Sequence, residues 1–464
     1  MSWQAVEGSF RDPSGFVYTR DHTLYRQVNA AFGKQFEAFI TSGLYDELTR
    51  EGLLVPHTQV GIELSATADA HAVLRPQRIP FISYPYEWSF GQLQDAASLT
   101  LEIQERALSK GFTLRDSSAY NVQFQGGRPI FIDTLSFEPL EEGKPWAAYK
   151  QFCEHFLLPL TLMTTRDIRC GTLLRVYADG IPLDFGSRLL PRRSWASLSS
   201  VLHLHLHAWA QGRYAGSAIS SAGKSKSMSR DSLVRLVQNL KSAVQRLSWK
   251  PAGTEWADYT SDNNYSDAAA RSKRALVVSH LSGSGVSTVW DLGANTGEYS
   301  RAAREVASQV ISFDVDPAAV ERNYRRVRSQ SETGILPLLL DLTNPSPAQG
   351  WAGQERLSLP QRGPADAVLA LALIHHLAIG HNLPLDRIAG YLSRLGRLLV
   401  IEFVPKSDSQ VKRLLLSRPD IFPGYTKEGF EAAFRREYEI KAVNPVADSE
   451  RWLYCMVSRH FPTA

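Results

Sequence analysis

The stretch VWDLGANTGE, residues 289–298, decides the fold of the C-terminal half of this chain. Its first residues predict a short buried strand, the glycines predict a turn, and a helix is expected to begin after Gly297. Glycine has no Cβ and tolerates unusual φ/ψ values, so a ligand can lie against bare backbone at Gly293 and Gly297. The unpaired N–H groups of the helix start add hydrogen-bond donors. The stretch therefore predicts a cofactor-binding turn, although an ordinary strand-to-helix link can also contain such glycines.

The spacing of the turn indicates which cofactor it binds. A dinucleotide fold has Gly-x-Gly-x-x-Gly after its first strand, whereas this turn reads Asp-x-Gly-x-x-x-Gly. An acid on the strand suits a ligand with a positive group better than a pyrophosphate. The turn resembles motif I of the class I S-adenosylmethionine-dependent methyltransferases. The resemblance implies five cofactor-binding residues: Asp291, Gly293, Ala294, Asn295 and Gly297.

Further acids end the next two predicted strands. The second apolar stretch ends in Asp314, and the third contains Asp341. In α/β nucleotide-binding folds an acid at the end of the second strand accepts hydrogen bonds from ribose hydroxyls, which is the role expected of Asp314. The methyltransferase resemblance implies that Asp341 lies near the adenine amino group. Asp is also a favoured helix cap, which we expect of Asp316, and the other acids could be caps too.

The order of the predicted elements indicates an α/β fold. Apolar stretches alternate with helical ones, which is typical of a parallel, doubly wound sheet. A closing antiparallel hairpin follows at residues 438–443 and 452–457. Over residues 273–464 this order resembles the Rossmann-like, seven-stranded methyltransferase sheet. The five apolar stretches are residues 289–292, 310–314, 335–342, 366–374 and 398–403.

Candidate catalytic residues follow the fourth and fifth strands. Histidine is the natural general base near neutral pH, and His375 and His376 follow the fourth strand. Either histidine could instead cap or pack the next helix. Glu402 and Lys406, after the fifth strand, are expected to face the same pocket, with catalytic and structural roles both open. A sulfonium methyl group is already electrophilic, so a base is needed only if the acceptor must first lose a proton.

Residues 212–272 connect the two halves of the chain. Residues 212–230 are rich in Gly, Ser, Lys and Arg, which predicts a flexible linker. Residues 231–247 carry apolar residues at helical spacing, so we expect residues 231–272 to be a helical segment that covers the cofactor. Within this segment, Tyr259 and Tyr265 either fold over the cofactor, as aromatic residues do in the methyltransferase family, or pack the helix onto the sheet.

Residues 1–211 predict an α+β domain with a polar signature of its own. Asp116 and Asn121 precede a predicted hairpin, and Asp133 follows it. These residues resemble the catalytic loop of kinase-like folds, in which the first Asp orients the acceptor hydroxyl and the other two residues hold magnesium. The sequence departs from that pattern: the leading His and the glycine-rich loop are missing, and only Arg26 could replace the strand lysine. The same residues could be a chance arrangement around a hairpin, and activity of this domain is doubtful.

Composition sets outer limits on function. The 464 residues are 44% hydrophobic and 21% charged, with a net charge of +4, which is an ordinary globular balance that requires no nucleic acid partner. The three cysteines contain no Cys-x-x-Cys pair, so we expect a reducing, cytoplasmic location. His203, His205 and His207 lack a nearby acid or Cys, so we expect a structural role and no metal. No apolar run reaches roughly 18 residues, so no membrane span is expected.

The whole chain is similar to nodulation host-specificity proteins of the methyltransferase type. The phrases YPYEWSF at residues 84–90 and FIDTLSFE at residues 131–138 carry this similarity. It implies a methyltransferase with a small-molecule or glycan-like acceptor, which the N-terminal domain binds or presents. The other hypotheses are a non-catalytic binding or assembly protein with a degenerate kinase-like domain, and a bifunctional kinase-methyltransferase.

Overall fold

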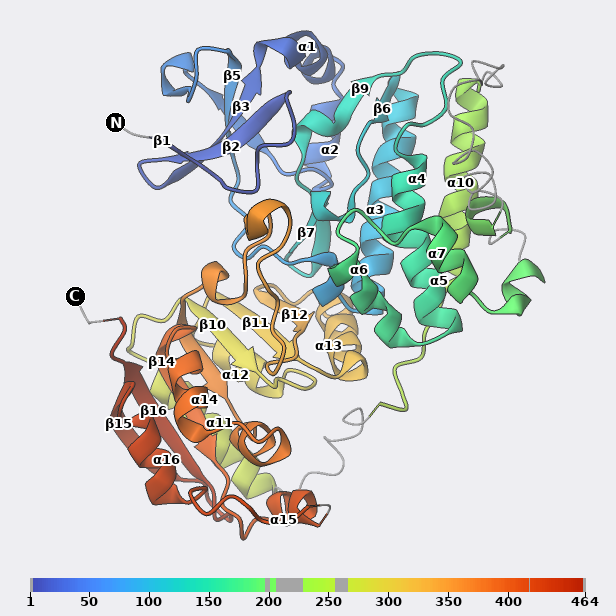
Figure 1. Cartoon of the computed structure of the whole chain (residues 1–464). Coiled ribbons are helices and arrows are strands. Elements are labelled where there is room, and N and C mark those ends of the chain that lie inside the picture. The colour runs from blue at the N-terminus through green and yellow to red at the C-terminus, as the bar shows by residue number, and fades with distance from the viewer. Residues whose placement is uncertain (1–2, 197–200, 206–227, 255–265, 417, 462–464) are drawn as a thin grey trace. The chain divides into compact units, whose positions relative to one another are not determined.

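The computed structural model describes residues 3–196, 201–205, 228–254, 266–416 and 418–461. The chain forms two compact units (Figure 1). Unit 1 consists of Met1–Lys250 with Gly350–Glu355, and unit 2 of Pro251–Gln349 with Arg356–Ala464. Residues 231–250, the first part of the segment predicted to cover the cofactor, belong to unit 1. Most of the predicted linker lies outside the described residues.

A mixed seven-stranded sheet forms the centre of unit 2 (Figure 1). Its spatial order is β12-β11-β10-β13-β14-β16-β15. The first five are parallel, and β16 runs antiparallel to β14 and β15. This order confirms the predicted Rossmann-like α/β fold with its closing hairpin. The strands are β10 (Thr288–Leu292), β11 (Gln309–Asp314), β12 (Ile335–Leu339), β13 (Ala365–Ala370), β14 (Gly396–Phe403), β15 (Tyr438–Pro445) and β16 (Trp452–Ser458).

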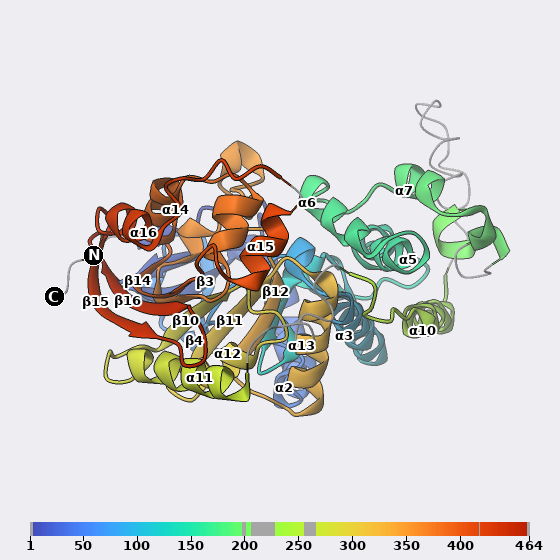
Figure 2. The same ribbon diagram turned by 90° about the horizontal axis from the view of Figure 1, so that it is seen from below.

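Helices cover both faces of this sheet, as the apolar strands require. Val277 of α11 and Ala303 of α12 pack in one buried cluster with strand residues such as Val289 and Val400. Figure 2 shows α11 and α12 on one side of the sheet and α14 and α16 on the other. The helices of unit 2 are α11 (Asp267–Leu281), α12 (Glu298–Arg304), α13 (Pro317–Ser329), α14 (Leu385–Leu392), α15 (Ser409–Leu415) and α16 (Lys427–Phe434).

One parallel crossover lacks an α-helix. Residues 340–364 connect β12 to β13 and contain only the short 3-10 turns Trp351–Gly353 and Pro360–Arg362. Parallel strands are usually joined by a helix that covers one face of the sheet. The face of unit 2 that carries α14 is therefore covered partly by irregular chain.

Unit 1 combines an antiparallel sheet with a helical part (Figure 1). The sheet has the order β1-β2-β3-β5-β4, and the long helix α3 follows it in the chain. The predicted hairpin after Asn121 is confirmed, because β7 and β8 pair antiparallel. The strands are β1 (Trp3–Ala5), β2 (Gly15–Arg20), β3 (Thr23–Asn29), β4 (His57–Val60), β5 (Ala70–Pro76), β6 (Phe112–Leu114), β7 (Val122–Gln125), β8 (Arg128–Phe131) and β9 (Phe137–Pro139).

Helix α10 is part of this helical region and packs against α3. Gln94 of α3 donates hydrogen bonds to the carbonyl oxygens of Val244 and Leu247, at 2.8 and 2.7 Å, and so fixes the end of α10. No helix in the described part of the chain is long and apolar enough to cross a membrane. The helices are α1 (Gly33–Thr41), α2 (Leu44–Arg50), α3 (Phe90–Ser109), α4 (Tyr149–Phe152), α5 (Leu158–Thr165), α6 (Leu173–Val176), α7 (Leu183–Leu189) and α10 (Arg230–Arg246).

Candidate cofactor and active site

The predicted turn lies between β10 and α12, at the carboxyl end of the parallel strands. Gly293, Asn295 and Gly297 all have positive φ, at 78°, 49° and 82°. The N–H groups of Gly293 and Ala294 both donate to the carbonyl oxygen of Phe313, at 2.8 and 2.9 Å. These bonds attach the start of the turn to the end of β11. Ligands of open α/β sheets bind at this edge.

The two glycines of the turn have different surroundings. A Cβ at Gly293 would make ordinary van der Waals contact with the Leu373 side chain, at 3.4 and 3.9 Å, so this glycine is needed for its backbone conformation and not for space. A Cβ at Gly297 would lie 2.5 to 2.7 Å from atoms of Asn323 and Arg301. Gly297 is therefore required by protein packing, whereas Gly293 is required by its positive φ.

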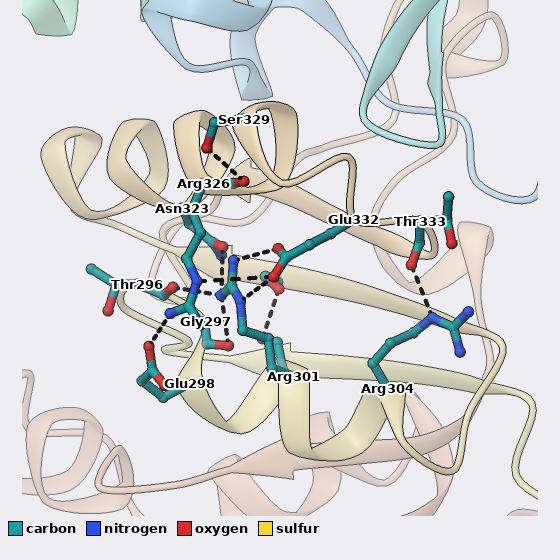
Figure 3. Close-up of polar contacts among 12 residues, drawn as sticks. Thr296, Gly297, Glu298, Arg301, Arg304, Asn323, Arg326, Ser329, Glu332 and Thr333 are labelled. Carbon is teal, nitrogen blue, oxygen red and sulfur yellow. Dashed lines mark hydrogen bonds and ion pairs between the residues drawn. The ribbon is translucent and has the colours of Figure 1, made fainter.

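Arg301 holds the second half of the turn (Figure 3). Its Nη1 donates to the carbonyl oxygens of Thr296 and Gly297, both at 2.9 Å, and to Asn323 Oδ1 at 3.0 Å. Its Nε and Nη2 donate to both oxygens of Glu332, at 2.9 and 2.7 Å. A planar guanidinium suits this bidentate arrangement. The sequence interpretation missed Arg301; the only available signal was its position one helical turn after Gly297.

Asp291 is buried on β10. Ser300 of α12 donates its hydroxyl to Asp291 Oδ2 at 2.6 Å, and Ser312 of β11 donates to Ser300 at 2.7 Å. Burial raises the pKa of Asp291 to about 6, and the negative charge of Asp314 adds to the rise, while Ser300 and the charge of Lys273 oppose it. The carboxylate is thus poorly compensated, and a positive ligand beside it would stabilise its charged form.

Asp314 contacts the turn directly. Its Oδ2 accepts the N–H of Asn295 at 2.7 Å, and its Oδ1 accepts the N–H of Asp316 at 2.8 Å. Burial raises the pKa of Asp314 to about 6 in spite of these bonds. Val315 also donates a backbone hydrogen bond to Asp314, so of the carboxylate's roughly four acceptor sites one remains for a hydroxyl. Asp316 caps α13 by accepting the N–H groups of Ala318 and Ala319, which confirms its predicted role as a cap.

Asp341 lies beyond the end of β12 and is exposed. Its Oδ1 accepts the N–H and the hydroxyl of Thr343, at 2.8 and 2.6 Å, so it also stabilises a local turn. The structure therefore brings Asp291 and Asp314 to the cofactor turn as buried groups and leaves Asp341 at the surface.

His375 and His376 follow β13, and their ring centroids are 4.1 Å apart. His375 is fully buried, and neither ring nitrogen has a hydrogen-bond partner among the described residues. Burial, the neighbouring His376 and the charges of Arg451 and Lys273 lower the pKa of His375 well below its usual value. Burial lowers the pKa of His376 to about 4. Both rings are therefore neutral at physiological pH.

Glu402 belongs to a buried ionic network. Its Oε2 lies 2.7 Å from Lys273 Nζ and accepts the N–H of Ala372 at 2.7 Å, and its Oε1 lies 3.8 Å from Arg451 Nη1. Arg451 also pairs with Asp408 at 2.8 Å. Ala372 has a φ of 50°, so Glu402 fixes a strained backbone position between β13 and the histidines.

The remaining predicted residues are Lys406, Tyr259 and Tyr265. Lys406 Nζ donates hydrogen bonds to both carboxylate oxygens of Asp420 and to the carbonyl oxygen of Phe422. Tyr259 and Tyr265 lie outside the described residues. Thr254, which precedes Tyr259 in the chain, donates its hydroxyl to Oδ1 of the α13 cap Asp316 at 2.7 Å.

In unit 1, the structure brings Asp116, Asn121 and Asp133 together. Asn121 Nδ2 lies 3.4 Å from the Ser136 hydroxyl, which donates to Asp133 at 2.5 Å. Burial raises the pKa of Asp116, and the charge of Asp133 adds to the rise, while a hydrogen bond from Asn121 opposes it. Arg26 of β3 pairs with Asp133, with 2.5 Å between Nη2 and Oδ1. The three predicted residues thus form one polar cluster with Arg26.

The histidine-rich segment has structural contacts. His203 lies 2.7 Å from both the Tyr149 hydroxyl and Asn239 Oδ1, and His205 lies 2.8 Å from the Ser194 hydroxyl. His207 is not among the described residues. In the described part of the chain, no group of three or more His, Cys, Asp or Glu residues is placed to hold a metal ion.

Solved structures with limited similarity include two kinds of methyltransferase. N-methyltransferase NodS from Bradyrhizobium japonicum WM9, in complex with S-adenosyl-L-homocysteine, is 12% identical, covers 44% of this chain and 100% of its own, and has a TM-score of 0.31. The bifunctional kinase-methyltransferase WbdD is 15% identical, covers 45% of this chain and 43% of its own, and has a TM-score of 0.30. Because these TM-scores are low, the fold of unit 2 is assigned from its strand order and not from these structures.

A sequence relative matches nearly the whole chain. No protein-family model matches. Nodulation protein NoeA of Rhizobium meliloti (strain 1021) is 36% identical over 455 residues, which cover 97% of this chain and 95% of the relative. An identity of this size over both units shows that the chain belongs to the family of nodulation protein NoeA.

Proposed function

We propose that unit 2 is an S-adenosylmethionine-dependent methyltransferase that acts on a small-molecule or glycan-like acceptor. The proposal is carried by one observation: the backbone of the glycine turn bonds directly to the Asp314 carboxylate, through the N–H of Asn295. Bare backbone and an acid at adjacent strand ends are what a nucleoside with a positive sulfonium centre requires.

The chemistry of the residues fits this cofactor. Gly293 presents backbone without a Cβ at the carboxyl end of the strands, and Asp314 retains a lone pair for a ribose hydroxyl. The positive charge of the ligand would offset the raised pKa values of Asp291 and Asp314. When bound, S-adenosylmethionine supplies an electrophilic methyl group. The residues that would hold it are Asp291, Gly293, Ala294, Asn295, Gly297, Asp314 and Asp341, and Tyr259 and Tyr265 are proposed to cover it.

The chain's own contribution is chiefly positioning of the acceptor. Well-oriented reactants can gain about 7–11 kcal/mol over a bimolecular reaction. His376 is neutral at physiological pH and is proposed to accept a proton from a hydroxyl or amine, with the His375 ring 4.1 Å from its own. Glu402 acts in this proposal by holding Ala372, and with it the segment that carries both histidines.

The proposal extends to the biological process and to the location of the reaction. The relative's name, nodulation protein, supports a role in nodulation. Unit 1 would bind or present the acceptor, and we place the reaction in the cytoplasm. The alternative is a non-catalytic binding or assembly protein. The proposal includes no nucleic acid partner, because the net charge of +4 is modest. It includes no membrane partner, because no apolar run in the sequence reaches roughly 18 residues.

A labelling experiment tests the proposal. The full chain is incubated with a host extract and a methyl donor that carries an isotopically labelled methyl group, and products are identified by mass spectrometry. A labelled product that forms with the wild type and not with Asp314→Ala supports the proposal and identifies the acceptor. Equal labelling with and without the protein would leave the assembly protein as the better account.

A second candidate function rests on the cluster in unit 1. Asp116, Asn121 and Asp133 are brought together after α3, and Arg26 supplies a positive charge from β3. Such a cluster could bind a nucleotide with magnesium, as kinase-like proteins do. We expect ATP and Mg²⁺ to raise the melting temperature of the wild type and not of Asp133→Ala. An equal change in melting temperature for the two proteins would exclude nucleotide binding by this cluster.

A further inference from the structure

An apolar cavity lies where unit 2 lacks a crossover helix. It has a volume of about 210 Å³ and is lined by the loop at residues 342–345, by Leu377 and Leu383 after β13, and by one face of α14. The cavity is open toward solvent, so a ligand can enter it from the surface. The cavity is therefore a place where an apolar group can be accommodated without displacing the core.

Helix α14 contributes two pairs of residues at a spacing of four. Ile388 and Leu392 are apolar residues that line the cavity, and Arg387 and Tyr391 are polar residues that line it. Residues four apart lie on the same side of a helix, with about 5–6 Å between Cβ atoms. The guanidinium of Arg387 and the hydroxyl of Tyr391 can therefore reach the same ligand group.

Both polar groups lack partners within the described chain. Arg387 is exposed and makes no hydrogen bond or ion pair among the described residues. The Tyr391 hydroxyl is buried and has no hydrogen-bond partner there either. A buried hydroxyl without a partner is costly, and a ligand acceptor would remove that cost. Arg394 adds positive charge, with its guanidinium carbon 5.7 Å from the centroid of the Tyr391 ring.

We propose that this cavity binds an amphipathic anion, whose carboxylate or phosphate head contacts Arg387 and Tyr391 and whose apolar body lies against Leu377, Ile388 and Leu392. Guanidinium groups bind such planar anions through paired hydrogen bonds. The apolar body gains from removal of its surface from water. None of the residues assigned to the cofactor lines the cavity, but the lining residue Thr343 donates hydrogen bonds to Asp341, so the experiment below measures S-adenosylmethionine affinity as well.

Titration of the full chain with octanoate tests the site, and octanol serves as the uncharged ligand with the same chain length. The wild type is expected to bind octanoate about tenfold more tightly than octanol, because only octanoate has a charge for Arg387. Arg387→Ala should remove this preference and leave octanol binding unchanged. The matched control is Arg435→Ala on α16, whose side chain pairs with Glu431 on the surface and which should keep the wild-type preference.

A filling variant tests the apolar part. Ile388→Trp should abolish binding of both ligands while leaving S-adenosylmethionine affinity unchanged, which separates this site from the cofactor site. Failure of octanoate to bind the wild type, or a preference that persists in Arg387→Ala, would overturn the proposal. Arg387 is exposed, so its substitution tests the site even if Ile388→Trp does not fold. Tyr391→Phe should weaken octanoate binding, and an unchanged affinity would remove Tyr391 from the site.

Discussion

Lys273 of α11 and Glu402 of β14 form an ion pair that is almost completely removed from solvent, with 2.7 Å between Nζ and Oε2. Their side chains are 1% and 0% exposed. The same Glu402 oxygen accepts the N–H of Ala372, so the pair connects the helix before the sheet to the segment that carries the candidate catalytic histidines. A charge that is buried this deeply is stable only beside an oppositely charged partner.

Lys273→Met should therefore destabilise the protein strongly. Removal of Lys273 leaves the buried Glu402 with only the more distant Arg451, and breaking a buried pair typically costs about 3–5 kcal/mol. Urea unfolding of the full chain measures the loss. The matched control is Lys441→Met, which breaks an exposed pair with Glu439 and should cost below about 1 kcal/mol. Equal losses in the two variants would show that burial of the Lys273 pair has no special effect.

Gly297→Ala should disturb the cofactor turn more than Gly283→Ala does. Both glycines have positive φ, at 82° and 74°, but a Cβ at Gly283 would meet no atom within 4 Å. Gly283→Ala should cost about 1–2 kcal/mol from backbone strain alone. Gly297→Ala adds contacts with Asn323 and Arg301, so it should lower the melting temperature further and weaken S-adenosylmethionine binding. Equal effects would mean that the contacts at Gly297 relax without consequence.

Arg301→Lys should weaken binding of S-adenosylmethionine by about tenfold, or 1.4 kcal/mol. A lysine lacks the planar fork that binds the turn carbonyls and Glu332 together. Arg304→Lys is the control, because Arg304 donates to the carbonyl oxygens of Thr333 and Ala307 and does not touch the turn. Calorimetric titration of both variants measures the difference, and an unchanged affinity in Arg301→Lys would contradict the positioning role.

The buried Asp291 predicts a specific dependence of stability on pH. The pKa of Asp291 is about 6 in the folded protein and 3.8 in its unperturbed state, so the folded protein holds this proton more tightly than the unfolded chain does. The resulting contribution to folding stability is fully present below pH 3.8 and is lost as the pH rises through 6. A shift of this size corresponds to about 3 kcal/mol. The unfolding free energy of the wild type minus that of Asp291→Asn should fall by about this amount between pH 4 and pH 7. A difference that stays constant over this range would place the pKa near its ordinary value.

Much of unit 2 could be predicted from the sequence because its strands are apolar on both faces and end in polar residues. The turn at residues 293–297 and the cap at Asp316 follow from local chemistry, and both are found where expected. Such features depend on neighbours in the chain, which the sequence displays directly.

Features that depend on distant partners could not be predicted in the same way. The spacing of apolar residues in α10 predicts a helix with one apolar face, but not that this face packs on α3. The pair between Lys273 and Glu402 joins residues 129 positions apart, and no local pattern indicates it. The same holds for Arg26 and Asp133 in unit 1, where the pairing arises from the fold of the whole unit.

Calorimetric titration of the full chain with S-adenosylmethionine tests the central claim most directly. The wild type should bind, and Asp314→Ala should bind more weakly by about tenfold or more. Asp366→Ala is the control, because Asp366 lies at the opposite end of the sheet and accepts the N–H groups of Ser287 and Thr288; it should bind like the wild type. A wild type that gives neither heat nor a thermal shift with S-adenosylmethionine would contradict the account.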